Sequence, residues 1–199
     1  MGKRQSSKAV IEKISLNLFS KYGFTGTSIR MIAKNAGVRE SAIYNHFNSK
    51  ADLLNKIFDK FNSGETGGQI LDDKLLEEIV NPPVFMKKFF DKLFEIWNSE
   101  TETMIFKIII LEQFSNKSEI IPTIDKYFQP VREIWEMIFI EMIKYNVIKK
   151  LDPKLLVDEF LSYIFLLRIK SLTEQDNYNK KIIRKVNSHI DFFWDKIKK

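Results

Sequence analysis

Residues 39–46, RESAIYNH, combine an arginine guanidinium, an alanine methyl and an asparagine amide within eight positions. In the major groove of DNA an asparagine can pair with adenine, an alanine can contact the thymine methyl, and an arginine can reach guanine or a phosphate. Asn45, Ala42 and Arg39 supply these groups. The outward positions of the stretch are Arg39, Glu40, Ser41, Ala42, Tyr44, Asn45 and His46. Such a small, polar and aromatic face fits a major groove.

These side chains need a short helix held firmly by its neighbours. The sequence IRMIAKNAGVRESAIYNHF, residues 29–47, contains two helical patterns that meet at Gly37, one over about Ser28–Ala36 and one over about Glu40–Phe47. Glycine ends a helix readily because it adopts the left-handed conformation without steric cost. The inward faces are formed by Ile29, Ile32, Ala33 and Ala36, then by Ile43 and Phe47. The pattern predicts a helix-turn-helix, although a plain helical hairpin within a bundle has the same spacing.

Charge distinguishes these two interpretations. Residues 1–50 hold nine Lys and Arg against two acids, a net charge of +7, whereas the rest of the chain has a net charge of −1. Scattered surface lysines are usually only solvated, but a one-sided excess is what a polyanion-binding module needs. The charge distribution therefore favours DNA binding by the N-terminal quarter.

Apolar residues recur at helical spacing, and all seven glycines lie at or before Gly68, which predicts an all-α fold of about nine helices. Besides the two above, we expect helices over about Ser7–Tyr22, Lys50–Phe61, Pro82–Asn98, Thr101–Phe114, Ile124–Val147, Asp152–Ser171 and Tyr178–Ile197. Ser49 and Asp52 form a capping box, and Pro130 is expected to kink or split its helix. The glycine-rich residues 62–69 predict a boundary between domains 1–61 and 62–199.

Several classes of protein are disfavoured by composition. The chain has no cysteine, its two histidines are His46 and His189, and neither a glycine-rich phosphate loop after Gly68 nor an HExxH motif is present. We therefore expect no enzyme, no metal site and no cofactor. The strongest apolar run, residues 104–114, is too short to span a bilayer, so we expect a cytoplasmic protein without a membrane partner.

The stretch LFSKYGFTGTSIRMIAKNAGVRESAIYNHFNSKADLL, residues 18–54, resembles the DNA-binding domain of the tetracycline-repressor-like (TetR) family of bacterial transcriptional regulators. The matching features are Phe19, Gly23, Thr27-Ser28, Ile32-Ala33, Ala36-Gly37-Val38, Tyr44, His46-Phe47, Ser49-Lys50 and Leu53-Leu54. The resemblance implies a homodimer on a palindromic double-stranded DNA operator. It also implies that the bound protein usually represses transcription, and that it releases the operator when a small molecule binds the C-terminal domain.

The resemblance also assigns roles to single residues. It implies that Thr27 or Ser28 caps the second helix and meets a phosphate, that Tyr44 and His46 contact phosphates or thymine, and that Lys50 meets a phosphate. Arg39 departs from the small capping residue that the family often has at this position. Glu40 replaces a basic or neutral residue. The helix dipole stabilises an acid at this position. The alternative is that Glu40 accepts a hydrogen bond from a cytosine amino group or repels wrong DNA sites.

The C-terminal part is rich in aromatic residues, which favours a pocket for a small, largely apolar effector, with a simple hydrophobic core as the alternative. The candidate pocket residues are Phe89, Leu93, Trp97, Met104, Ile108, Trp135 and Phe139. The family resemblance implies a dimer interface on the last two helices, for which the candidates are Phe160, Ile164, Leu167, Ile183, Val186, Ile190 and Phe193; intramolecular packing alone is the alternative. A rival function is that of a constitutive helical DNA-binding protein with no effector.

Overall fold

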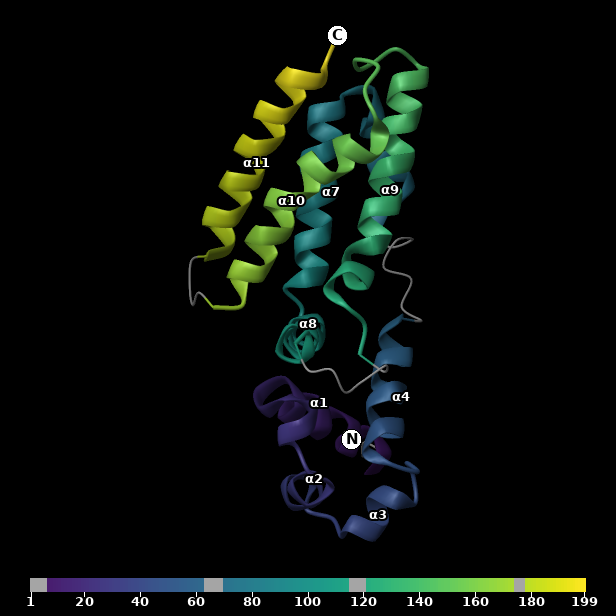
Figure 1. The fold of residues 1–199 in the computed structure, drawn as a ribbon, viewed down its shortest axis with the longest axis vertical. Helices are drawn as coiled ribbons and strands as arrows, with labels where there is room; N and C mark the ends of the chain where they lie inside the picture. The colour runs from purple at the N-terminus through teal and green to yellow at the C-terminus, as the bar shows by residue number, and fades with distance from the viewer. Residues whose placement is uncertain (1–6, 63–69, 115–120, 174–177) are drawn as a thin grey trace. The chain divides into compact units, whose positions relative to one another are not determined.

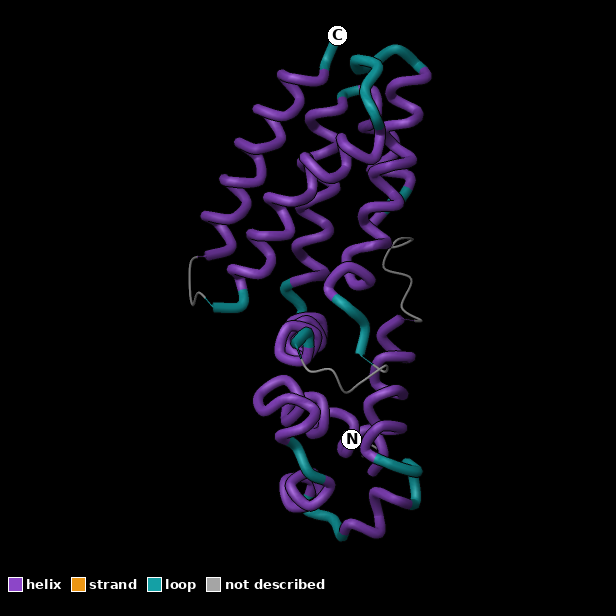
Figure 2. The backbone as a smooth tube through the Cα atoms, viewed as in Figure 1, coloured by secondary structure: helices purple, strands orange, loops and turns teal. Residues whose placement is uncertain are grey.

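The computed structural model describes residues 7–62, 70–114, 121–173 and 178–199, and within these ranges every regular element is a helix (Figures 1 and 2). The elements are α1 (Ser7–Gly26), α2 (Ile29–Ala36), α3 (Glu40–Tyr44), α4 (Lys50–Asn62), α6 (Asp73–Leu76), the 3-10 helix η1 (Glu77–Val80), α7 (Pro82–Trp97), α8 (Glu100–Glu112), α9 (Ile124–Lys144), α10 (Pro153–Ser171) and α11 (Tyr178–Ile197). The predicted all-α fold is confirmed. In the described part of the chain, no helix is long and apolar enough to cross a membrane.

Four elements differ from the sequence expectation. Helix α3 ends at Tyr44 rather than at Phe47. Helix α9 runs through Pro130 without a break, because residues on both sides of the proline, including Phe128 and Trp135, are buried and hold the two halves in register. The short helices α6 and η1 were not expected, since their eight residues give too little periodicity to recognise.

The chain forms two compact units. The first lies within residues 1–64 and 99–124, and the second within residues 65–98 and 125–199. Helix α8 therefore belongs to the first unit, where it packs against α1 (Figure 1). The expected boundary after residue 61 takes no account of this helix, because an apolar face in a sequence does not say which partner covers it.

In the first unit, local signals fix the turn between α2 and α3. The Ser28 hydroxyl accepts a hydrogen bond from the Met31 amide at 3.1 Å and so caps α2. Gly37 ends α2 in the left-handed conformation, with φ of 64°, and the Val38 amide donates to the Ala33 carbonyl at 3.0 Å. These bonds satisfy backbone groups that a helix end would otherwise leave unpaired.

In the second unit, α7, α9, α10 and α11 enclose an aromatic core. The Trp135 ring lies at its centre, 5.0 Å from the ring of Phe89, 5.7 Å from Phe90 and 4.8 Å from Phe160. All four side chains are buried. Offset and edge-to-face aromatic contacts of this kind add to the stabilisation that burial itself provides.

Candidate DNA-binding face

Helix α3 presents the residues that could contact bases and buries the ones that anchor it. Ile43 and Phe47 are 0% and 1% exposed, so they hold α3 against the first unit. The residues around these two anchors are Arg39, Glu40, Ser41, Tyr44 and Asn45, which are exposed, and Ala42 and His46, which are partly exposed. All seven predicted residues are therefore at least partly open to solvent.

The start of α3 differs from the start of α2. Arg39 occupies the N-cap position, but its side chain makes no capping hydrogen bond. Its exposed guanidinium is thus directed to solvent rather than to the helix end. Glu40 lies in the first turn, where the partial positive charge of the helix terminus stabilises its carboxylate.

Ser28 and Thr27 have separate roles at the start of α2. Ser28 is the exposed cap described above and can also meet a phosphate. Thr27 is only 1% exposed, and its hydroxyl donates to the carbonyl of Gly23 at 2.8 Å or of Leu18 at 3.2 Å. The expectation that Thr27 could contact DNA is therefore corrected, because its hydroxyl lies inside the unit and bonds to its own backbone.

Lys50 also has partners within the unit. Its ammonium donates to the carbonyls of Phe24 and Thr27, both at 2.7 Å, and lies 4.2 Å from the centre of the Phe24 ring. Burial lowers the pKa of Lys50, while the nearby Glu112 carboxylate opposes that shift. Lys50 thus bonds α4 to the corner between α1 and α2, and its contact with a DNA phosphate stays a prediction.

Two lysines that the sequence analysis did not single out surround the anchor of α3. The ammonium groups of Lys8 and Lys56 lie 5.9 and 5.3 Å from the centre of the Phe47 ring. Lys56 also pairs with Asp52 at 2.9 Å, and the pKa of Asp52 is lowered by the hydrogen bond from Lys56 and then by the one from the Asn48 amide. Lys8 is one of the basic residues whose excess in residues 1–50 indicated DNA binding. The position of Lys8 beside Phe47, however, depends on packing between helices.

His46 joins this cluster from the end of the recognition segment. Its Nε2 atom lies 3.0 Å from the Ser7 hydroxyl, and its ring meets the Phe47 ring edge-on. The start of α1 therefore lies beside the residues that follow α3. This proximity could not be read from sequence, since the two residues are 39 positions apart.

The candidate pocket residues are divided between the two units. Phe89, Leu93, Trp97, Trp135 and Phe139 are buried in the second unit, while Met104 and Ile108 lie on α8 in the first. The indole N–H of Trp135 has no hydrogen-bond partner among the described residues. An unpaired buried donor is costly, so this group would gain from an acceptor supplied by a ligand.

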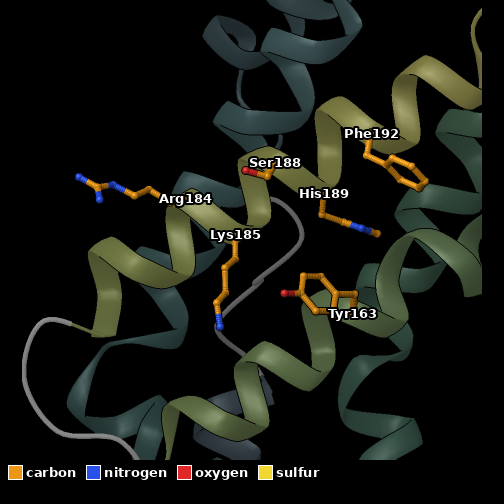
Figure 3. Close-up of a pocket in the computed structure, with 6 residues that line it drawn as sticks. All are labelled: Tyr163, Arg184, Lys185, Ser188, His189 and Phe192. Atoms are coloured by element: carbon orange, nitrogen blue, oxygen red, sulfur yellow. The ribbon is translucent and has the colours of Figure 1, made fainter.

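A separate hollow of about 400 Å³ lies on the surface of α10 and α11 (Figure 3). It is lined by Tyr163, Arg184, Lys185, Ser188, His189 and Phe192. The His189 ring donates from Nε2 to the Phe160 carbonyl at 2.8 Å and lies 5.2 Å from the Tyr163 ring. No pattern in the sequence predicts this hollow.

The candidate dimer residues are mostly part of the core. Phe160, Ile164, Leu167, Val186, Ile190 and Phe193 are buried within the second unit, and Ile183 alone of this set is exposed. The apolar side chains that α10 and α11 leave exposed are instead Leu155, Tyr163, Leu166, Ile183 and Phe192. A dimer interface on α10 and α11 therefore stays a prediction, and the exposed apolar side chains of the two helices are the surface left for it.

Comparison with known proteins agrees with this description of the first unit. Residues 13–57 match the family model of bacterial regulatory proteins of the tetR family. The chain is 44% identical over 55 residues to the HTH-type transcriptional regulator AcrR of Shigella flexneri, covering 28% of this chain and 26% of AcrR. It is 33% identical over 90 residues to the regulator TtgR of Pseudomonas putida, covering 45% of this chain and 42% of TtgR. These matches span less than half of the relatives' lengths.

Solved structures extend the similarity in fold to the whole chain. A SmeT–triclosan complex superposes with a TM-score of 0.69 at 16% identity, covering 98% of this chain and 93% of SmeT. The ketosteroid regulator KstR2 of Mycobacterium tuberculosis superposes with a TM-score of 0.67 at 16% identity, covering 100% of this chain and 98% of KstR2. At these identities the likeness shows the fold. The similarity in sequence to the tetR family rests on residues 13–57.

The position of Lys50 gives a prediction about stability without DNA. Lys50→Ala should lower the free energy of unfolding by about 1–2 kcal/mol, because the Phe24 and Thr27 carbonyls lose a charged donor. Lys34→Ala, at an exposed position of α2, should change it by less than about 0.5 kcal/mol. Urea unfolding of the free protein measures both. Equal effects of the two substitutions would show that Lys50 has no internal role.

Proposed function

We propose that this protein is a sequence-specific DNA-binding transcriptional regulator that responds to a small ligand and acts as a homodimer. The observation that carries the proposal is the exposed face of α3, which is anchored by Ile43 and Phe47 within a strongly basic unit. The match to tetR-family regulators over residues 13–57 supports it. The protein would act in the cytoplasm, where bacterial operators are found, most simply as a repressor.

In this proposal α3 enters the major groove. Asn45 pairs with an adenine edge, Ala42 contacts a thymine methyl, and Arg39 reaches guanine or a phosphate. Tyr44 and Ser28 contact the DNA backbone on either side. Lys50 contributes by holding the corner between α1 and α2 in place.

Base reading and backbone contact can be separated by two substitutions. Asn45→Ala should weaken binding to the preferred sequence by about 1–3 kcal/mol and relax the preference at one base pair of each half-site. Lys34→Ala should weaken binding to all sequences about equally and reduce the steepness of the salt dependence. Titrations of selected and scrambled duplexes at several salt concentrations test this. A base preference that changes with Lys34 but not with Asn45 would refute the assigned orientation of α3.

The proposed dimer uses the exposed apolar residues of α10 and α11. Phe192 is 63% exposed, which is unusual for so large an apolar side chain on an otherwise well-packed helix. A second copy that covers this face would bury it and would place two recognition helices about a two-fold axis. Such an arrangement requires an operator that is an inverted repeat.

The dimer proposal gives a contrast between neighbouring positions. Phe192→Asp should yield a folded monomer with little operator affinity, because it charges the exposed face and leaves the core intact. Ile190→Asp should instead unfold the second unit, since Ile190 is fully buried. Sedimentation and circular dichroism distinguish the two outcomes. A Phe192→Asp protein that sediments as an intact dimer would move the interface elsewhere.

The proposed effector is a small, largely apolar molecule with a hydrogen-bond acceptor. The aromatic core of the second unit offers apolar surface, and the indole N–H of Trp135 offers a buried donor. Two proteins of the same fold point in the same direction, since one was solved with triclosan and the other is described as a ketosteroid regulator. By linkage, such a ligand weakens DNA binding only if it prefers the DNA-incompetent form.

The response to effector can be tested through the tryptophans. Triclosan and related apolar compounds should change the fluorescence of Trp97 and Trp135, and should bind the free protein roughly 5–150-fold more tightly than the operator-bound protein. Parallel titrations with and without a selected duplex measure the ratio. A compound that binds both forms with equal affinity would favour the rival function, a constitutive DNA-binding protein.

A further inference from the structure

Helix α8 contributes one carboxylate to the corner between α1 and α2. The Phe24 amide donates to Oε1 of Glu112 at 2.7 Å, and the two residues are 88 positions apart. Glu112 is the last residue of α8. An acid is disfavoured at the C-terminus of a helix, where the helix dipole is negative, so this carboxylate gains from a partner beyond its own helix.

Gly23 makes room for this contact. Its backbone is not helical, with φ of 72°, and it interrupts α1 so that the next amide is free to point outward. A Cβ atom at Gly23 would lie 2.6 Å from Oε1 of Glu112, closer than two such atoms can approach. The break in α1 thus creates both the donor and the space that the carboxylate occupies.

Phe24 is held from two sides. Its amide is bound by Glu112 of α8, and its carbonyl is bound by Lys50 of α4 at 2.7 Å. Lys50 also binds the carbonyl of Thr27, which directly precedes the cap of α2. The charge of Glu112 favours the protonated form of Lys50, against the effect of burial on the Lys50 pKa. Helices α8 and α4 therefore both bind the backbone of Phe24, and Lys50 of α4 also binds the residue before the cap of α2.

We infer that Glu112 is a positioning residue for the DNA-binding face. It fixes the corner at Gly23–Ser28, and through this corner it sets the start of α2. The inference rests on the proposed function and deepens it.

The test uses the full chain and a duplex selected by the wild-type protein from a random library. Glu112→Ala removes the acceptor, Glu112→Gln keeps an acceptor oxygen but removes the charge, and Glu100→Gln is the control at an exposed position of the same helix. Operator affinity is measured well below the melting temperature of each variant. Amide exchange of Phe24 and the pKa of Lys50 are measured by NMR.

Glu112→Ala should bind the selected duplex about tenfold more weakly and should exchange the Phe24 amide faster, because a charged hydrogen bond is lost. Glu112→Gln should bind the duplex with an affinity between those of Glu112→Ala and the wild type. It should also lower the pKa of Lys50. The affinity of Glu100→Gln for the duplex should stay within about twofold of the wild-type affinity, because surface substitutions usually have small effects. A purely structural role would lower the melting temperature of Glu112→Ala without changing its affinity for the duplex.

Two results would contradict the account in different ways. If Glu112→Ala exchanges the Phe24 amide faster yet binds the duplex as tightly as the wild type, the positioning role is wrong and the proposed function stands. If the wild-type protein itself selects no duplex, the proposed function fails, and the inference fails with it. The wild-type selection is complete before any variant is compared, so the two failures are distinct.

Discussion

The shortness of α3 is the constraint on which the DNA-binding face depends. A helix of five residues is not stable on its own in water, because too few hydrogen bonds offset the cost of starting it. Its position is therefore set by the burial of Ile43 and Phe47 and by the turn at Gly37. A rigid scaffold that positions a short reading element is a common way to combine precision with exposed polar side chains.

The neighbours of α3 need fixing in turn. Helix α2 begins at the corner that follows α1. The side chains of Thr27, Lys50 of α4 and Glu112 of α8 all form hydrogen bonds with the backbone of this corner. Each of these side chains forms a hydrogen bond with a backbone group of the corner. Polar bonds thus hold the corner between α1 and α2 in position, whereas the burial of apolar side chains holds α3 in position.

Sequence reasoning reached the features of this unit that depend on local chemistry. Gly37 at the turn and the exposed residues of α3 follow from preferences that act within a few residues, whereas the cap of α2 stayed open between Thr27 and Ser28. The roles of Lys50 and Glu112 could not be predicted from the sequence, because their hydrogen-bond partners lie 26 and 88 positions away along the chain. Thr27 and Ser28 are adjacent and chemically similar, and only the fold shows which hydroxyl is buried. The same limit applies to α10 and α11, where periodicity identified apolar faces but not which one covers the core.

The central claim is that the face of α3 reads a defined DNA sequence. Repeated selection from a library of random duplexes by the full-length protein tests it most directly, followed by sequencing of the bound fraction. The account predicts enrichment of an inverted repeat whose half-sites lie roughly one helical turn apart or slightly more, as two recognition helices related by a two-fold axis require. Binding without any enriched sequence, at a strength that depends only on salt, would contradict it.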